Sequence, residues 1–163
     1  MNDQDLLEAV RLIADYQFGF RVGSRLFPNE SKIQVSKKTG RPRYILLGDK
    51  LLATVRSSDG MLALTLYGGE RLSHIIEWPR RRIIVKDSHL DKVLEMKVVK
   101  ADWVSYVDEN LAPNEEVLVY NSSRRLIGVG RVTTSGKTIL TVSGGTVVKI
   151  REVDEKIRPD PVP

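Results

Sequence analysis

Residues 117–131 read Val117-Leu-Val-Tyr-Asn-Ser-Ser-Arg-Arg-Leu-Ile-Gly-Val-Gly-Arg131 and predict two antiparallel strands joined by a tight turn. Val117–Tyr120 is β-branched and aromatic, as strands are, and Asn121 with the two serines after it favours a turn. Gly128 and Gly130 alternate with branched apolar residues, so one face of the second strand carries no side chains. Such glycines mark a bulge, a barrel corner or a close backbone approach. We expect them to close a small barrel rather than to contact a ligand.

The composition excludes several classes of site. The chain has 163 residues, of which 41% are hydrophobic, enough for one medium domain or two small ones. It has no cysteine, which excludes disulfides, thiolate zinc sites and cysteine nucleophiles and suits a reducing, cytoplasmic compartment. No apolar run is long enough to span a bilayer and no signal peptide opens the sequence, so we expect no membrane attachment. The net charge of +5 suits a polyanionic partner.

The first half of the chain predicts a helix, a second short helical piece at residues 22–26, a β-meander and a further helix. Asp5 to Glu8 has the spacing of a capping box, and the apolar period that follows indicates an amphipathic helix ending near Gly19. From Ile33 to Leu66 the pattern changes to a period of two, broken by turn residues. We expect four antiparallel strands there, and then a helix over residues 70–78 after a glycine pair ends the sheet.

The second half predicts a further set of short elements after Pro79. A strand at residues 82–86 precedes a short helix that a Ser88–Asp91 capping box would open. Residues 98–106 are extended, residues 117–132 form the hairpin, and residues 138–142 and 146–153 are expected to be strands. The fold class is therefore α+β, with domains at residues 1–78 and 80–153, and a proline-rich, charged tail at 154–163 that we expect to be disordered.

Catalysis, metals and cofactors find little support in the residue pattern. His74 and His89 are the only near-neutral acid–base groups. His74 lies on a predicted amphipathic helix, where a packed or exposed histidine is the common outcome, and His89 has no obvious carboxylate partner in its sequence context. No spacing of His, Asp and Glu resembles a metal site, and no glycine pattern matches a phosphate loop. We predict a protein that is not an enzyme and carries no cofactor.

Basic residues gather at turns and strand ends, where guanidinium and ammonium groups reach phosphates well. Two interpretations stay open at this point: a nucleic-acid surface, or a solvated face in which acidic residues are interspersed. Trp103 and Tyr106 could stack on bases, although we expect one of them to be in the core. The basic groups lie at Lys37, Lys38, Arg41 and Arg43, at Arg80, Arg81, Arg82 and Lys86, and at Arg124, Arg125, Arg131 and Lys137.

Longer segments carry a resemblance to a known family. In the second half these are Arg82-Ile-Ile-Val, Leu111-Ala-Pro-Asn-Glu-Glu-Val-Leu-Val, Leu126-Ile-Gly-Val-Gly-Arg131 and Gly145-Thr-Val-Val-Lys-Ile-Arg151. Together they resemble a PUA domain, the RNA-binding pseudobarrel of pseudouridine synthases and archaeosine transglycosylases. In the first half, Ala14-Asp-Tyr-Gln-Phe-Gly19, Ser36-Lys-Lys-Thr-Gly-Arg41, Arg56-Ser-Ser-Asp-Gly60 and Leu66-Tyr-Gly-Gly-Glu-Arg-Leu72 resemble the pre-PUA domain of archaeosine tRNA-guanine transglycosylases. Asn114 and Glu95 stand where the family commonly has glycine.

The resemblance implies a pre-PUA α/β-meander module followed by a PUA β-pseudobarrel. It implies a tRNA-binding protein acting in tRNA modification, and since the catalytic barrel of the family is missing, a detached subunit that serves a separate catalytic transglycosylase chain. In the family the first PUA helix and neighbouring strands line the RNA groove. The RNA-binding residues expected here are Lys86, His89, Lys92, Lys97, Lys100 and Arg151, with Arg80, Arg81, Lys37, Lys38, Arg41 and Arg43 in support. The alternative is a PUA-containing protein-interaction or ribosome-associated translation factor.

Overall fold

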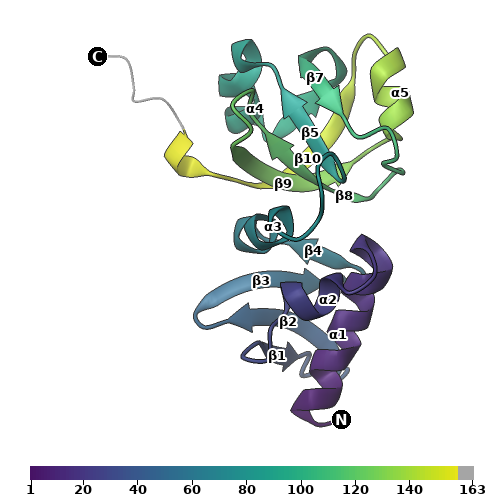
Figure 1. Cartoon of the computed structure of the whole chain (residues 1–163), viewed down its shortest axis with the longest axis vertical. Coiled ribbons are helices and arrows are strands. Elements are labelled where there is room, and N and C mark those ends of the chain that lie inside the picture. Colours follow the sequence, from purple (N-terminus) through teal and green to yellow (C-terminus); the bar gives the residue numbers. More distant parts are fainter. Residues whose placement is uncertain (158–163) are drawn as a thin grey trace. The chain divides into compact units, whose positions relative to one another are not determined.

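The computed structural model describes residues 1–157 and divides into two compact units, Met1–Glu77 and a second unit that starts at Trp78 (Figure 1). Each unit has its own sheet, and no strand of one sheet pairs with a strand of the other. The units are therefore described one at a time.

The first unit is a four-stranded antiparallel meander with three helices. The strands pair in chain order, β1-β2-β3-β4, which confirms the four predicted strands. The elements are α1 (Asp3–Phe18), α2 (Val22–Leu26), β1 (Lys32–Val35), β2 (Pro42–Leu47), β3 (Lys50–Val55), β4 (Leu62–Leu64) and α3 (Leu66–Ser73).

Helix α1 buries one face and is capped at both ends. Leu6, Val10, Ala14 and Phe18, spaced four residues apart, are all buried. The capping box was predicted at Asp5–Glu8, one turn after its actual position at Asn2–Asp5. The Oδ1 atom of Asn2 accepts a hydrogen bond from the backbone N–H of Asp5, at 2.8 Å. The end of the helix at Gly19, where φ is 127°, is confirmed.

Helix α3 starts earlier than the sequence indicated, and the prediction of a helix over residues 70–78 was wrong at both ends. Thr65 caps its N-terminus, and Gly68 and Gly69 lie inside the helix rather than breaking the chain. The reason is close packing, because a Cβ atom on Gly68 would lie 2.0 Å from the backbone oxygen of Leu52. Glycine is required there for contact with the sheet, not for a turn.

The second unit is a curled six-stranded sheet in the order β6-β10-β9-β8-β5-β7, with short helices at its edges (Figure 1). All neighbours are antiparallel except β5 and β8, which run parallel. The elements are β5 (Arg82–Val85), the 3-10 helix η1 (Asp87–His89), α4 (Leu90–Met96), β6 (Val98–Lys100), η2 (Ala101–Trp103), β7 (Val104–Val107), β8 (Glu116–Tyr120), β9 (Leu126–Val132), α5 (Gly136–Thr141), β10 (Thr146–Val153) and η3 (Glu155–Ile157).

The hairpin of β8 and β9 lies at the centre of this sheet and is buried along nearly its whole length. Its glycines admit the neighbouring strand: a Cβ atom on Gly130 would lie 2.1 Å from the backbone oxygen of Lys149 in β10, and one on Gly128 would lie 3.1 Å from that of Glu152. The close backbone approach predicted from the alternating glycines is confirmed. The glycines therefore serve to curl the sheet.

Three further predictions for the second unit were wrong. Residues 98–106 are not extended throughout, because η2 separates β6 from β7. Residues 138–142 are not a strand, because α5 covers them up to Thr141, capped by the Ser135 hydroxyl that accepts from the N–H of Thr138 at 3.1 Å. The Ser88 side chain caps no helix, since η1 leads directly into α4. Of the predicted tail at 154–163, residues 155–157 form η3, and residues 158–163 lie outside the described residues.

Candidate nucleic-acid interface

Part of the predicted RNA-binding set gathers around Trp103 in the second unit. The rings of His89 and Trp103 stack with centroids 5.5 Å apart, and the Nζ atom of Lys100 lies 5.8 Å from the centre of the Trp103 ring. The Nζ atom of Lys86 donates to the backbone oxygen of Asp102 at 2.8 Å. Trp103 is itself buried, so this ring orients its basic neighbours and is not available to stack on a base.

Lys92 and Lys97 lie on the adjoining helix α4 and at its end, and both are exposed. Lys97 terminates the helix in the left-handed conformation, with φ of 55°. Because β6 starts at the next residue, the ammonium groups of Lys97 and Lys100 project from one short segment. We call Lys86, Lys92, Lys97 and Lys100 the lysine surface.

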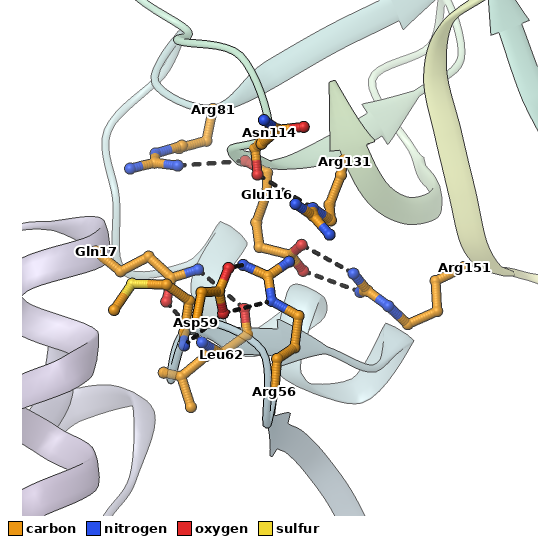
Figure 2. Close-up of polar contacts among 10 residues, drawn as sticks. Gln17, Arg56, Asp59, Leu62, Arg81, Asn114, Glu116, Arg131 and Arg151 are labelled. Carbon is orange, nitrogen blue, oxygen red and sulfur yellow. Dashed lines mark hydrogen bonds and ion pairs between the residues drawn. The ribbon is translucent and has the colours of Figure 1, made fainter. Parts of the chain in front are cut away.

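Arg151 is held by a buried carboxylate. Its guanidinium donates two hydrogen bonds to Glu116, at 2.9 and 2.8 Å, and Glu116 is only 2% exposed (Figure 2). This fork joins β10 to β8 across β9. The geometry gives Arg151 a structural role within the sheet, whatever its contribution to RNA binding.

Arg80 and Arg81 precede β5 and differ in their surroundings. Arg80 is exposed, whereas Arg81 is half-buried, has φ of 63° and forms an ion pair with Glu115. Burial lowers the pKa of the Arg81 guanidinium, and the charge of Glu115 opposes that shift. Its backbone N–H also donates to Asp108, at 2.8 Å. Arg81 therefore anchors the start of the unit.

A group of aromatic and arginine side chains was missed in the sequence. Trp78 stacks with Tyr106 at 6.3 Å, and Arg124 lies over the Trp78 ring at 4.4 Å. Arg82 lies on the same ring at 5.1 Å and is buried. The sequence singled out Tyr106, Arg82 and Arg124 separately, but not their shared partner Trp78, which lies far from the β8–β9 turn in the chain. Tyr106 is exposed and Trp103 is buried, so the expected division between these two aromatics is confirmed.

In the first unit, the structure brings the predicted hairpin cations together with a second loop. Lys38, Arg41 and Arg43 line a groove of about 650 Å³ between the β1–β2 and β3–β4 loops, and Lys37 lies on the same loop outside the lining. Arg43 is held beside Tyr44, with its Nε atom 3.4 Å from the phenol oxygen. The other lining residues are Ser36, Thr39, Pro42, Val55, Arg56, Ser57, Ser58, Asp59 and Gly60.

The walls of this groove are fixed by contacts to α1 and within the β3–β4 loop. The side-chain amide of Gln17 pairs with both backbone groups of Leu62, at 2.9 and 2.8 Å (Figure 2). Arg56 binds Asp59 through two contacts, at 3.1 and 3.0 Å. The single acidic side chain in the lining is thus paired with an arginine.

No group of three or more His, Asp or Glu side chains within residues 1–157 could hold a metal ion. In the same part of the chain, no helix combines the length and the apolar character that crossing a membrane requires.

Comparisons with known families agree with the division into two units. Residues 8–79 match the family described as the patch-forming domain C2 of tRNA-guanine transglycosylase, and residues 81–153 match the PUA domain family. The tRNA-guanine(15) transglycosylase of Methanothermobacter thermautotrophicus is 34% identical over 148 residues, which is 91% of this chain and 23% of the relative. The tRNA-guanine(15) transglycosylase of Thermoplasma volcanium is 37% identical over 147 residues, which is 90% of this chain and 23% of the relative. The chain thus spans about a quarter of the length of the curated relatives it matches.

Solved structures support the fold. A hypothetical protein from Pyrococcus horikoshii superposes with a TM-score of 0.72 at 18% identity, over 95% of both chains. A conserved PUA domain protein from Thermoplasma acidophilum superposes with a TM-score of 0.61 at 14% identity, over 96% of this chain and 95% of that chain. Both matches extend over nearly the whole of each chain, so the combination of the two units is itself a known architecture.

Proposed function

We propose that this chain, which joins a C2 domain of the tRNA-guanine transglycosylase family to a PUA domain, binds tRNA and acts in tRNA modification. The observation that carries the proposal is the continuous match, over about nine-tenths of the chain, to enzymes named for exchange of a guanine in tRNA. These relatives contain both units in one polypeptide. The proposed setting is the cytoplasm, where tRNA is modified.

The surface chemistry of the second unit supports an RNA ligand. The lysine surface carries four ammonium groups on consecutive elements from the end of β5 to β6. Lys100 lies near the ring of Trp103, on which His89 stacks. Folded RNA is recognised mainly by shape, phosphates and 2′-hydroxyls, for which exposed lysines on a rigid edge are well suited. We assign the lysine surface to the phosphates of the tRNA.

We further propose that the chain does not exchange bases by itself and that a separate transglycosylase polypeptide supplies the chemistry. Support comes from the two histidines. His74 pairs with Glu70 on an exposed helix face. His89 stacks on Trp103, and its Nδ1 atom lies 3.1 Å from the Ser88 hydroxyl, but no carboxylate within residues 1–157 orients the His89 ring for general-base catalysis. The purified chain alone should leave guanine in tRNA unexchanged, and a mixture of the chain with a separate transglycosylase catalytic domain should exchange it. Exchange by the chain alone, abolished by His74→Ala or His89→Ala, would refute this.

The test of RNA binding is the affinity for a tRNA transcript measured against salt concentration. Lys97→Asn with Lys100→Gln removes two charges, and Asn tolerates the left-handed conformation at position 97. Binding constants fall with salt to the power of about −0.9 for each phosphate contact, so each lost contact lowers the affinity about 5-fold at 0.15 M salt. We therefore expect a loss of about 30-fold for two contacts and a slope smaller by about 1.8.

The control is Lys137→Gln with Lys156→Gln, which removes the same charge from exposed lysines of α5 and η3. A loss of equal size in both double variants would show a general charge effect and refute the lysine surface. Wild-type protein that recovers ribosomal proteins from cell extract without tRNA would favour the alternative, a translation-associated interaction module.

A further inference from the structure

The two loops that border the groove of the first unit have the same backbone construction. In the β1–β2 loop, the N–H of Ser36 donates to the oxygen of Arg41 and the N–H of Gly40 donates to the oxygen of Ser36, both at 2.8 Å. In the β3–β4 loop, the N–H of Arg56 donates to the oxygen of Met61, and the N–H of Gly60 donates to the oxygen of Arg56, again both at 2.8 Å. Gly40 and Gly60 have φ of 71° and 73°. The chain thus builds one rigid loop twice, at the same end of one meander.

The space between the loops is polar and carries net positive charge. Four of its lining residues are basic and one is acidic, and that acid, Asp59, is bound to Arg56. The remaining three cations, Lys38, Arg41 and Arg43, have no carboxylate partner within residues 1–157. Pro42 and Val55 are the only apolar lining residues apart from a glycine.

Hydroxyl groups of the β3–β4 loop line the groove together with the cations. Ser57 and Ser58, on the β3–β4 loop, make no hydrogen bond to another residue within 1–157, and the side chains of Lys38 and Arg41 make none either. Ser36 and Thr39, in contrast, are used to hold their own loop, since their hydroxyls accept from the N–H groups of Lys38 and Arg41. The groove therefore keeps donors from both loops available to an anion.

We propose that this groove is a second RNA contact, in which the sugar-phosphate backbone lies between the two loops. Its phosphates face Lys38, Arg41 and Arg43, and the hydroxyls of Ser57 and Ser58 donate to phosphate oxygens from the β3–β4 loop. Guanidinium groups match two phosphate oxygens at once, and the position of the charges on paired loops avoids the entropic cost of ordering a flexible segment. This inference rests on the proposed RNA-binding function and extends it to the first unit.

The experiment measures the affinity of the full chain for a tRNA transcript against salt, with variants matched in charge. Arg41→Gln with Arg43→Gln removes two charges from the groove. Lys32→Gln with Lys50→Gln removes two from the opposite end of the same strands, because Lys32 begins β1 and Lys50 begins β3. All four residues are exposed, and the contacts that the changes remove, Arg43 with Tyr44 and Lys50 with Tyr67, lie at the surface. We therefore expect the unit to stay folded in both variants.

The groove variant should bind about 30-fold more weakly at 0.15 M salt, with a slope smaller by about 1.8, and should approach the wild type near 1 M. The control should stay within about 2-fold, and Ser57→Ala with Ser58→Ala should weaken binding without changing the slope. Equal affinities of the groove and control variants, while the second-unit lysine variant still loses binding, would overturn the groove and leave the proposed function standing. Absence of tRNA binding by the wild type would overturn both.

Discussion

Arg151 offers a direct test of how the second sheet is held together. The substitution Arg151→Ala removes the guanidinium that binds Glu116 through two hydrogen bonds. Glu116 belongs to the central strand β8 and is 2% exposed, whereas the Arg151 side chain is 33% exposed. The carboxylate is therefore the more deeply buried partner, and it loses this compensation when the arginine is truncated.

The magnitude follows from that asymmetry. Removal of one partner from a buried ion pair costs about 3–5 kcal/mol, because a charge stays buried with less compensation. Water reaches the arginine side of this pair, which reduces the cost to about 2–3 kcal/mol. For a chain of this size we expect the melting temperature to fall on the order of 5 to 10 °C.

The assay is thermal unfolding followed by circular dichroism, with Arg125→Ala as the matched control. Arg125 also pairs with a carboxylate of the second unit, Asp154, but at 3.5 Å and with its own side chain 57% exposed. Its loss should cost less than about 0.5 kcal/mol. Equal melting temperatures for the two variants would refute the assignment of Arg151 to the sheet. A weaker affinity of Arg151→Ala for RNA is informative only below the melting transition.

Three other expectations are open to direct measurement. Gly130→Ala should destabilise the protein by about 1–3 kcal/mol in a denaturant titration, because the new Cβ atom would clash with the backbone of β10. The control is Gly144→Ala, whose Cβ atom would meet nothing within 4 Å and which should change stability by less than about 0.5 kcal/mol. Ser135→Ala should cost about 1 kcal/mol by removing the cap of α5, and no change would argue against that helix. The Ser122 hydroxyl and N–H lower the pKa of Asp87, so this contact stabilises the fold at neutral pH and is lost as pH falls through the lowered pKa. Ser122→Ala should raise that pKa in an NMR titration, and an unchanged value would contradict the contact.

The strands of the meander and the central hairpin were predictable because their signals are local. Turn residues and a period of two place β1 to β4, and two glycines in alternation predict the close approach of β10 to β9. In such segments, backbone preference and burial favour the same structure. One sequence was therefore enough to predict their pairing.

The errors arise where a tertiary contact overrides a local preference. The β-branched residues of α5 favour a strand, but the Ser135 cap and the burial of Ile139 select a helix. Gly68 looks like a breaker in sequence, yet it lies within a helix because the backbone of β3 approaches it. Neither contact leaves a signal in the segment itself.

The candidate site was predictable in its residue types more than in its geometry. Charge placement singled out the hairpin cations, whereas the lysines of α4 and β6 were expected only from the resemblance to the PUA family. It could not show that Arg151 lies against Glu116, since these residues are far apart in sequence, or that the β3–β4 loop completes a groove with the β1–β2 loop. Residues distant in the chain therefore determine which basic side chains form ion pairs within the protein and which can bind a ligand.

The place of β10 between β6 and β9 also has a consequence for synthesis on the ribosome. The meander of the first unit pairs each strand with its predecessor and is complete once Leu64 has emerged. The second sheet has to wait for Thr146–Val153, and until then β6 and β9 each present an unpaired edge to other nascent chains. A stop codon just before Thr146 would therefore yield a first unit that folds and a second that aggregates.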